Sequence, residues 1–135
     1  MINYPTDKRA VGVIIKDNNV LLMQRIKNGR SYFIFPGGSV EQGETIEDTV
    51  IREMKEEVSL SVKLDKLLFQ IENFGREEYY FLIKEFSGTI AIGGPEKERM
   101  NKNNQYHPIW IPLTDLISLG NLYPEEARLK IYNLF

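Results

Sequence analysis

Short apolar runs separated by turn-forming residues dominate the first part of the chain, a pattern typical of β-strands. We expect strands over residues 10–15 and 20–24, joined by a hairpin turn at 16–19, and a short aromatic strand over residues 32–35. Pro36 ends this last strand, because proline cannot donate a backbone hydrogen bond to a sheet.

A helical period begins at Ile46, where apolar residues recur at positions 46, 50, 54 and 58. Thr45 followed by Asp48 is a favourable N-cap with an acidic partner in the first turn, so we expect the helix to begin at Ile46. The glycine pair at 37–38 is expected to open a loop that extends to Glu44.

The remainder of the chain is expected to return to strands before a final helix. Strands are predicted over residues 61–71, 79–86, 89–92 and 109–111, and a helix over 125–134 with Pro124 at its favoured first position. Residues 93–105 are too polar to pack and are expected to form a mobile surface loop. Because helices interleave with strands that form hairpins, the expected fold class is α/β, a mixed sheet covered by helices in one domain over residues 1–135.

Composition narrows the classes of function. The chain has 135 residues and a net charge of -2, so it offers no basic field for duplex nucleic acid or an anionic membrane. It has no cysteine, its N-terminus lacks the apolar stretch of a signal peptide, and no window approaches the ~20 apolar residues of a membrane span. We therefore expect a cytoplasmic protein.

Three glutamates lie where a helix disfavours them. Glu53, Glu56 and Glu57 share one face near the predicted C-terminus, although like charges repel there and the macrodipole opposes anions. On a helical wheel Glu57 falls between apolar positions and points toward the buried edge. A solvated acidic face is the alternative, but buried charges must be paired or must hold a cation. An oxygen-only ligand set favours Mg²⁺, Mn²⁺ or Ca²⁺ over zinc.

Two neighbouring features support a cation site. The glycine pair Gly37 and Gly38 lets the backbone approach a ligand closely, because neither residue has a Cβ. Arg52 is four residues before Glu56 and eight after Glu44, so it can pair with carboxylates and orient the metal ligands.

These residues resemble the signature of the Nudix hydrolases, G-x5-E-x7-R-E-U-x-E-E-x-G-U, in which U is a bulky aliphatic residue. Eight of its nine specified positions fit over 23 residues, and the exception is Ser59, where the family usually has glycine. The preceding stretch VLLMQRIKNGRSYFIFPGG is similar to MutT-like members. The matching positions are Gly38, Glu44, Arg52, Glu53, Met54, Glu56, Glu57 and Leu60.

The resemblance implies a Nudix-type α/β/α sandwich and a metal-dependent hydrolase with Mg²⁺ or Mn²⁺ as its cofactor. Glu53, Glu56 and Glu57 would be metal ligands with the Gly37 carbonyl, while Glu44 and Arg52 hold them in place. Many MutT-like members place a further acid in the loop before the last strand, which indicates Glu98 or, less favourably, Glu96. Metal ions would neutralise a pyrophosphate and activate water for its hydrolysis.

The implied substrate is a small-molecule nucleoside diphosphate linked to another group. A nucleoside triphosphate is the first choice by default, and a dinucleoside polyphosphate is an alternative. A Nudix-fold module that binds a nucleotide without hydrolysis is the main rival, and a calcium-stabilised structural domain is a weaker one. Duplex nucleic acid and membranes are not expected as partners, whereas a homodimer is consistent with the sequence.

Substrate contacts are predicted from the same resemblance. Arg25 occupies a position where related proteins carry a basic residue, and guanidinium groups match phosphate oxygens. Asn121 resembles the position of an amide that contacts the base, and the backbone of Gly37 and Gly38 would lie near the phosphates. Aromatic residues could stack on a base or belong to the core; they are Phe33, Phe35, Phe74, Tyr79 and Tyr80.

Overall fold

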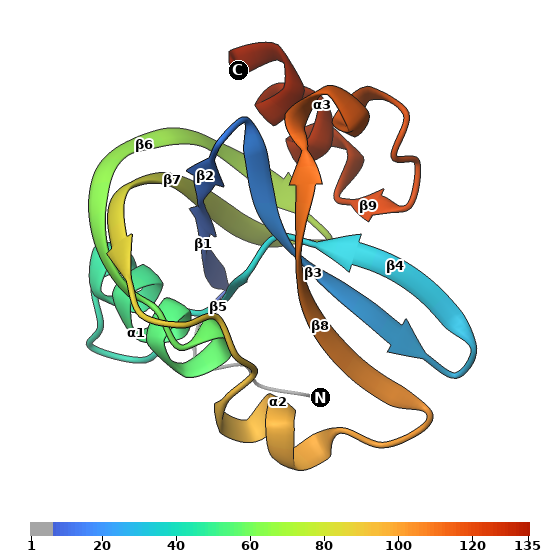
Figure 1. The fold of residues 1–135 in the computed structure, drawn as a ribbon. Helices are drawn as coiled ribbons and strands as arrows, with labels where there is room; N and C mark the ends of the chain where they lie inside the picture. Colours follow the sequence, from blue (N-terminus) through green and yellow to red (C-terminus); the bar gives the residue numbers. More distant parts are fainter. Residues whose placement is uncertain (1–6) are drawn as a thin grey trace.

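The computed structural model describes residues 7–135, apart from the side chains of Pro95 and Glu96, and contains two mixed β-sheets with helices on both sides (Figure 1). The first sheet has the order β5 (Gly37–Ser39), β1 (Lys8–Val13), β7 (Arg76–Ser87), β6 (Ser61–Asn73). The second has the order β2 (Ile15–Lys16), β3 (Asn19–Lys27), β4 (Arg30–Ile34), β9 (Leu122–Tyr123), with β8 (Asn104–Pro112) also paired to β3. The pairs β1–β7 and β4–β9 are parallel and the others are antiparallel, which confirms the mixed character that the sequence predicts.

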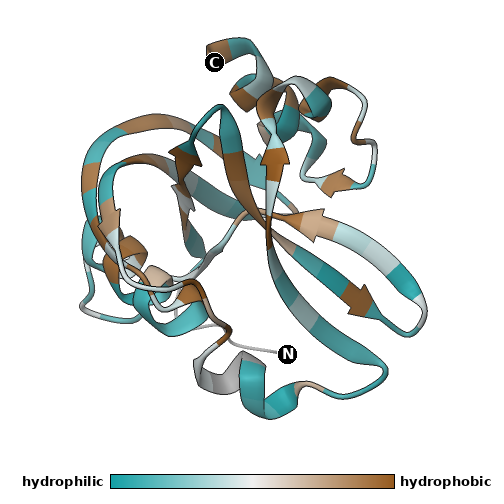
Figure 2. Cartoon of the chain, viewed as in Figure 1, coloured by the Kyte–Doolittle hydropathy of each residue, from teal (hydrophilic) through white to brown (hydrophobic). Residues whose placement is uncertain are grey.

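Residues 10–13 of β1 and 20–23 of β3 are buried on both faces of the sheet, because apolar or small residues occupy consecutive positions and alternate side chains point to opposite sides. Ala10 and Met23 belong to a core cluster on one side, together with Met54 of α1 (Ile46–Val58). Val11 and Leu22 belong to a second cluster with Ile131 of α3 (Glu125–Leu134). Helices therefore cover both sides, and the expected α/β/α arrangement is confirmed. Figure 2 shows the apolar colour of β3 along the half nearest β2 and again at its arrowhead.

Two short segments differ from the sequence-based predictions. Gly37–Ser39 forms strand β5, paired with β1 through Ala10 and Gly38, instead of opening a loop. Residues 89–92 do not form a strand, because their backbone bonds to a helix end: the Ala91 N–H donates to the Val58 carbonyl at 3.1 Å. Pro124 is the N-cap of α3 in an extended conformation, one position before the predicted first turn.

The polar segment 93–105 is also more ordered than predicted. It contains a short helix, α2 (Gly94–Arg99), and the first residues of β8. Strand β8 pairs with β3 from Asn104 opposite Lys27 to Pro112 opposite Asn19, so backbone pairing outweighs the polar composition of its first half. A 3₁₀ helix, η1 (Leu113–Ile117), follows β8. None of the helices within residues 7–135 combines the length and the apolar character that crossing a membrane requires.

Candidate active site

Helix α1 places the three signature glutamates, and both of its ends are defined. At the start, the Thr45 side chain accepts a hydrogen bond from the Asp48 N–H at 3.0 Å, as the sequence predicts. At the end, Ser59 takes the left-handed conformation with φ 64° and ψ 30°, and its N–H bonds to the Met54 carbonyl. Serine therefore adopts here the conformation that glycine usually supplies.

Glu57 is a buried carboxylate. Only 4% of the residue is exposed, and its Oε2 accepts a hydrogen bond from the Gly37 N–H at 3.2 Å. The burial that the helical wheel predicts for Glu57 is confirmed. A buried carboxylate needs a hydrogen-bond donor or a cation to remain charged. The Gly37 N–H supplies such a donor, and this bond joins the start of β5 to the end of α1.

Gly38 makes room for Glu53. A Cβ at position 38 would lie 2.2 Å from the carboxyl carbon of Glu53, a separation at which something must move. Gly37 is equally constrained, because its Cβ would lie 2.4 Å from the Ala10 carbonyl oxygen across the strand pair. Both glycines thus serve a close approach, of a carboxylate at Gly38 and of strand β1 at Gly37.

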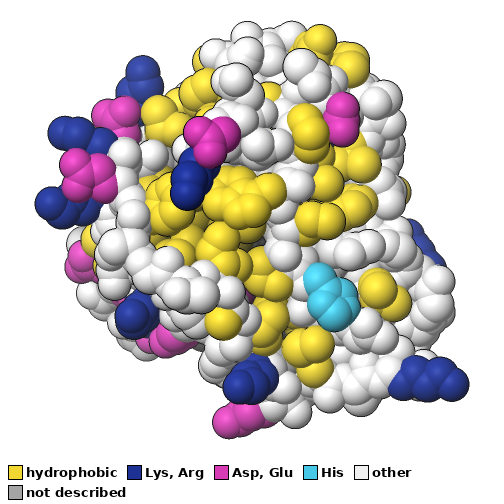
Figure 3. Space-filling model, in the orientation of Figure 1, with side chains coloured by type: hydrophobic (Ala, Val, Ile, Leu, Met, Phe, Trp, Pro, Cys, Tyr) yellow, Lys and Arg dark blue, Asp and Glu magenta, His cyan; other side chains and the backbone are white. Residues whose placement is uncertain are grey.

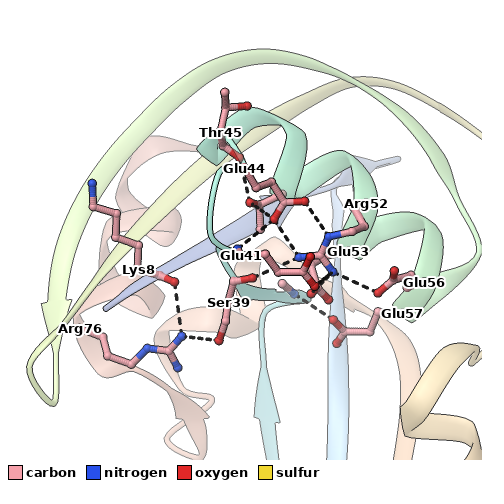
Figure 4. Close-up of polar contacts among 12 residues, drawn as sticks. Lys8, Ser39, Glu41, Glu44, Thr45, Arg52, Glu53, Glu56, Glu57 and Arg76 are labelled. Carbon is pink, nitrogen blue, oxygen red and sulfur yellow. Dashed lines mark hydrogen bonds and ion pairs between the residues drawn. The ribbon is translucent and has the colours of Figure 1, made fainter. Parts of the chain in front are cut away.

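Arg52 connects the acidic side chains, as Figure 4 shows. Its Nε and Nη2 donate to both oxygens of Glu44 at 2.7 and 3.0 Å, in a bidentate pair. Its Nη1 lies 2.9 Å from Glu53 Oε1 and 3.1 Å from Glu56 Oε2. Nη2 also donates to the Ser39 carbonyl at 3.1 Å. One guanidinium therefore joins the loop before α1, strand β5 and two of the three helix glutamates.

The pair formed by Glu44 and Arg52 stays charged over a wide pH range. The hydrogen bond from Arg52 lowers the pKa of Glu44 from 4.5 to about 2, assisted by hydrogen bonds from the Thr49 hydroxyl and the Glu41 N–H. The bond to Glu44 in turn raises the pKa of Arg52 above its ordinary value. The predicted pairing of Glu44 with Arg52 is thus present in the fold.

The donor atoms suit a hard divalent cation, although the carboxylates do not converge on one point. Among the side chains that the structure describes, no group of three or more His, Cys, Asp or Glu is placed to hold a metal ion together. Arg52 Nη1 instead donates hydrogen bonds to both Glu53 and Glu56. The donors are nevertheless all oxygens, and one of them, on Glu57, is buried in a way that a cation would stabilise. The role of Glu53, Glu56 and Glu57 as metal ligands stays a prediction.

Arg25 lies outside this network, in the part of β3 beyond the core. Its guanidinium carbon sits 3.8 Å from the centre of the Tyr106 ring, and Nη2 donates to the Asn104 side chain at 2.5 Å. Nε donates to the Gln105 carbonyl at 3.3 Å. These contacts fix the plane of the guanidinium on β8, and the role of Arg25 toward substrate stays a prediction.

Among the side chains that the structure describes, the other predicted substrate and loop residues form no hydrogen bond or ion pair with the Arg52 network. Asn121 is tied to β4, since its Nδ2 donates to the Ser31 carbonyl at 3.3 Å and its own carbonyl accepts from the Phe33 N–H. Glu98 is exposed on α2, while the side chain of Glu96 lies outside the described part of the structure. The substrate and catalytic roles of these residues stay predictions.

Most of the candidate aromatic residues belong to the core or its edge. Phe35 and Tyr80 are buried and meet edge to face at 5.6 Å, and Phe33 packs on the same cluster. The Tyr79 hydroxyl donates to Glu77 at 2.7 Å. Phe74 is 98% exposed at the tip of the β6–β7 hairpin, so of this set it alone lies fully in solvent.

Two contributors to the site were not predicted. The Thr49 hydroxyl donates to Glu44 at 2.7 Å from a fully buried position, and the Ser39 backbone carbonyl accepts from Arg52. The polar Thr49 next to the apolar stripe is a signal that could have been noticed. A backbone carbonyl gives no sequence signal at all, so Ser39 could be found only from the fold.

The chain is similar in sequence to a known family and to characterised relatives. The chain matches the family model of the NUDIX domain over residues 6–132. It is 37% identical over 94 residues to the ADP-ribose pyrophosphatase of Methanocaldococcus jannaschii, a match that covers 64% of this chain and 56% of the relative. It is 30% identical over 86 residues to the 8-oxo-dGTP diphosphatase of Escherichia coli, covering 58% of this chain and 67% of that protein. The chain thus spans about half the length of the archaeal relative.

Solved structures share the fold. The MutT NUDIX hydrolase from Burkholderia pseudomallei superposes with a TM-score of 0.74 at 21% identity, covering 95% of this chain and 97% of that one. The E. coli ORF135 protein gives a TM-score of 0.71 at 21% identity, covering 94% and 87% of the two chains. At this level of identity the likeness concerns the fold alone.

Proposed function

This chain belongs to the Nudix family, and on that premise we propose that it is a diphosphohydrolase that cleaves a nucleoside diphosphate linked to another group. The observation that carries the proposal is the Arg52 network: one guanidinium holds Glu44, Glu53 and Glu56 beside the buried carboxylate of Glu57. Such a concentration of acids costs stability unless a cation is part of the working structure.

Nudix hydrolases generally need a divalent metal ion, and we propose Mg²⁺ or Mn²⁺ here. Bound metal supplies charge neutralisation of the pyrophosphate and a lowered pKa of a coordinated water. The residues that would hold it are Glu53, Glu56 and Glu57, with the Gly37 carbonyl as a further ligand. Glu44 and Arg52 would orient these ligands, and their charged state near neutral pH suits that role.

Arg25 is the proposed contact for a phosphate group of the substrate. Its guanidinium is already fixed by Tyr106 and Asn104, so little side-chain entropy is lost when a phosphate binds. Glu98 on α2 is the proposed general base, with Glu96 as the alternative. Asn121 is the proposed contact for the base.

A nucleoside triphosphate is the simplest candidate substrate. Relatives carry names for three kinds of substrate, ADP-ribose, RNA and 8-oxo-dGTP. ADP-ribose and 8-oxo-dGTP contain a nucleoside diphosphate unit, and an RNA contains one where its 5′ end is di- or triphosphorylated. The rival binding module rested on Ser59, but Ser59 adopts the left-handed conformation that this position requires, so the end of α1 is intact. We therefore favour the hydrolase over the binding module.

The test is a hydrolysis screen in Mg²⁺ over nucleoside triphosphates, ADP-ribose, dinucleoside polyphosphates and 5′-triphosphorylated RNA. We expect turnover of at least one substrate by the wild type and loss of at least ~100-fold in kcat for Glu57→Gln. Binding without turnover in both Mg²⁺ and Mn²⁺ would instead establish the binding module.

A further inference from the structure

A second concave surface lies beyond the acidic site, at the end of the β3–β4 hairpin. This hairpin pocket has a volume of about 410 Å³. Its lining consists of Lys27, Asn28, Arg30, Tyr32 and Tyr123. It therefore combines two cationic side chains, two phenol rings and one amide, with no carboxylate.

The hairpin pocket opens on the sheet face that α1 covers. Met23 packs in the cluster that contains Met54 of α1, and alternate residues of β3 after Met23 point to the same side. The next two such residues are Arg25 and Lys27, so Lys27 lies ~13 Å along the strand from Met23. Residues paired across neighbouring strands share a face, and Arg25 is paired with Tyr32. One continuous face therefore runs from α1 past Arg25 to the hairpin pocket.

The hairpin tip and the two aromatic rings of the pocket are held in place before any ligand binds. The Asn28 N–H donates to the Asn103 carbonyl at 2.9 Å, which ties the hairpin tip to the segment before β8. Tyr32 and Tyr123 meet edge to face with ring centres 6.4 Å apart. The Arg25 guanidinium carbon lies 6.0 Å from the Tyr32 ring and 3.8 Å from the Tyr106 ring. The rings therefore need little further ordering when a ligand enters.

Charge distinguishes this pocket from the other large cavity near the site. That cavity, of about 550 Å³, adjoins Glu44 and is lined by four carboxylates and one lysine, so it repels a phosphate. Those charged residues are Asp7, Lys8, Glu41, Glu44 and Glu77. At the opposite end, Figure 3 shows basic and no acidic colour where the β3–β4 hairpin ends, at the lower right of the view.

We propose that the hairpin pocket binds a second nucleotide of the substrate, with its phosphate against Lys27 and Arg30 and its base against Tyr32 and Tyr123. A phosphate suits the cations, and a planar base suits the phenol rings. This inference rests on the proposed function and narrows it. A nucleoside triphosphate occupies the acidic site, Arg25 and the proposed base contact Asn121, whereas a two-nucleotide substrate also fills the hairpin pocket. The second nucleotide belongs either to a dinucleoside polyphosphate or to the 5′ end of an RNA.

Calorimetric titration of hydrolysis-resistant analogues tests the inference independently of turnover. The probes are β,γ-methylene ATP, a methylene-bridged diadenosine tetraphosphate, and a 5′-triphosphorylated diribonucleotide with the β,γ-methylene bridge. We expect at least one two-nucleotide probe to bind at least ~10-fold more tightly than the ATP analogue, and the preferred one identifies the source of the second nucleotide. Equal affinity for all three probes would overturn the inference.

Variants of pocket residues test whether the extra affinity of the two-nucleotide probe comes from the hairpin pocket. We expect Lys27→Gln and Tyr123→Ala each to lower the affinity for the preferred two-nucleotide probe at least ~3-fold, while binding of the ATP analogue changes less than ~2-fold. Lys16→Gln is the matched control, because Lys16 is another exposed strand lysine outside the pocket. Loss of affinity for all probes alike, or for none, would contradict the inference. If the two-nucleotide probe binds more tightly than the ATP analogue but no substrate is hydrolysed, the inference about the hairpin pocket is supported and the proposed function is wrong.

Discussion

Ser59 Oγ donates a hydrogen bond of 3.0 Å to the Ala91 carbonyl, joining the end of the acidic helix to the segment that leads into α2. A second bond, from the Ala91 N–H to the Val58 carbonyl, runs beside it. Gly93 continues this contact, since a Cβ there would lie 2.7 Å from the Glu56 carbonyl oxygen. The position where the family usually has glycine thus serves here as an attachment point for α2.

The substitution Ser59→Gly should have two opposing effects. Glycine relieves the left-handed strain of Ser59, worth up to ~1 kcal/mol. It also removes the hydroxyl bond to Ala91, which contributes ~0.5–1.5 kcal/mol. We therefore expect the free energy of unfolding to change by less than ~0.5 kcal/mol in a denaturant titration. Amide exchange at Ala91 should become faster.

The matched variant Ser59→Ala keeps the strain and loses the hydroxyl. It should be less stable than Ser59→Gly by ~1 kcal/mol, the difference between alanine and glycine in this conformation. A gain of a full ~1 kcal/mol for Ser59→Gly would show that the bond to Ala91 contributes nothing.

Glu57→Gln should separate activity from stability. The glutamine carbonyl can still accept from the Gly37 N–H, so the fold should survive. Without metal, stability should be equal or higher, because one repelling anion is removed from the face that carries Glu53. In saturating Mg²⁺, kcat should fall at least ~100-fold. Steady-state kinetics measure kcat, and thermal melts with and without metal measure the stability. Full activity of Glu57→Gln in saturating Mg²⁺ would refute the proposed role of Glu57 as a metal ligand.

Gly38→Ala tests the contact between strand β5 and Glu53. The added Cβ would meet the Glu53 carboxylate at 2.2 Å, and this flexible side chain must move away. We expect kcat to fall at least ~10-fold, with a stability loss of no more than ~1–3 kcal/mol. Gly120→Ala is the control, since its Cβ has open space around it. Wild-type kcat for Gly38→Ala would show that the position of Glu53 is unimportant.

Acid should weaken the fold through Glu44. Its pKa is lowered to about 2 in the folded protein from an ordinary 4.5, so its stabilising effect is complete above pH 4.5. That effect is lost as the pH falls from 4.5 toward 2, because the unfolded chain then takes up the proton first. We expect Glu44→Gln to remove ~1–2 kcal/mol of stability at pH 7, after allowance for solvent screening, and less at pH 3. Denaturant titrations at several pH values measure the difference in free energy of unfolding between the wild type and Glu44→Gln. If this difference is the same at pH 3 and pH 7, Arg52 does not stabilise the Glu44 carboxylate.

The helix and its acids were predictable because local rules agree with tertiary structure there. Thr45 caps the helix and Glu57 is buried, both as the pattern indicates. The segment 89–92 was predicted wrongly, because its apolar residues read as a strand while the nearest hydrogen-bond partner is the end of α1. Strand β8 was predicted too short, because pairing with β3 orders polar residues that have no strand propensity of their own.

The convergence of distant residues could not be read from the chain alone. Arg25 and Tyr106 are far apart in sequence, and only the pairing of β3 with β8 brings the guanidinium onto the ring. The glycine pair illustrates the same limit. The sequence predicted that the backbone at Gly37 and Gly38 approaches another group closely. It did not indicate that the group next to Gly38 is the Glu53 carboxylate.

Glu98 is the last group whose role can be tested directly. It is exposed on α2, and the segment that leads into α2 is attached to the end of α1 by the bond between Ser59 and Ala91. Because the Glu98 side chain is exposed and not part of the core, Glu98→Gln should leave the melting temperature unchanged. We expect kcat to fall ~100-fold or more, the usual contribution of a general base, with a changed pH profile. Glu72→Gln, an exposed acid on β6, is the control for loss of charge. If Glu98→Gln and Glu96→Gln both keep wild-type turnover across the pH series, the base must be Glu53 or Glu56 on α1.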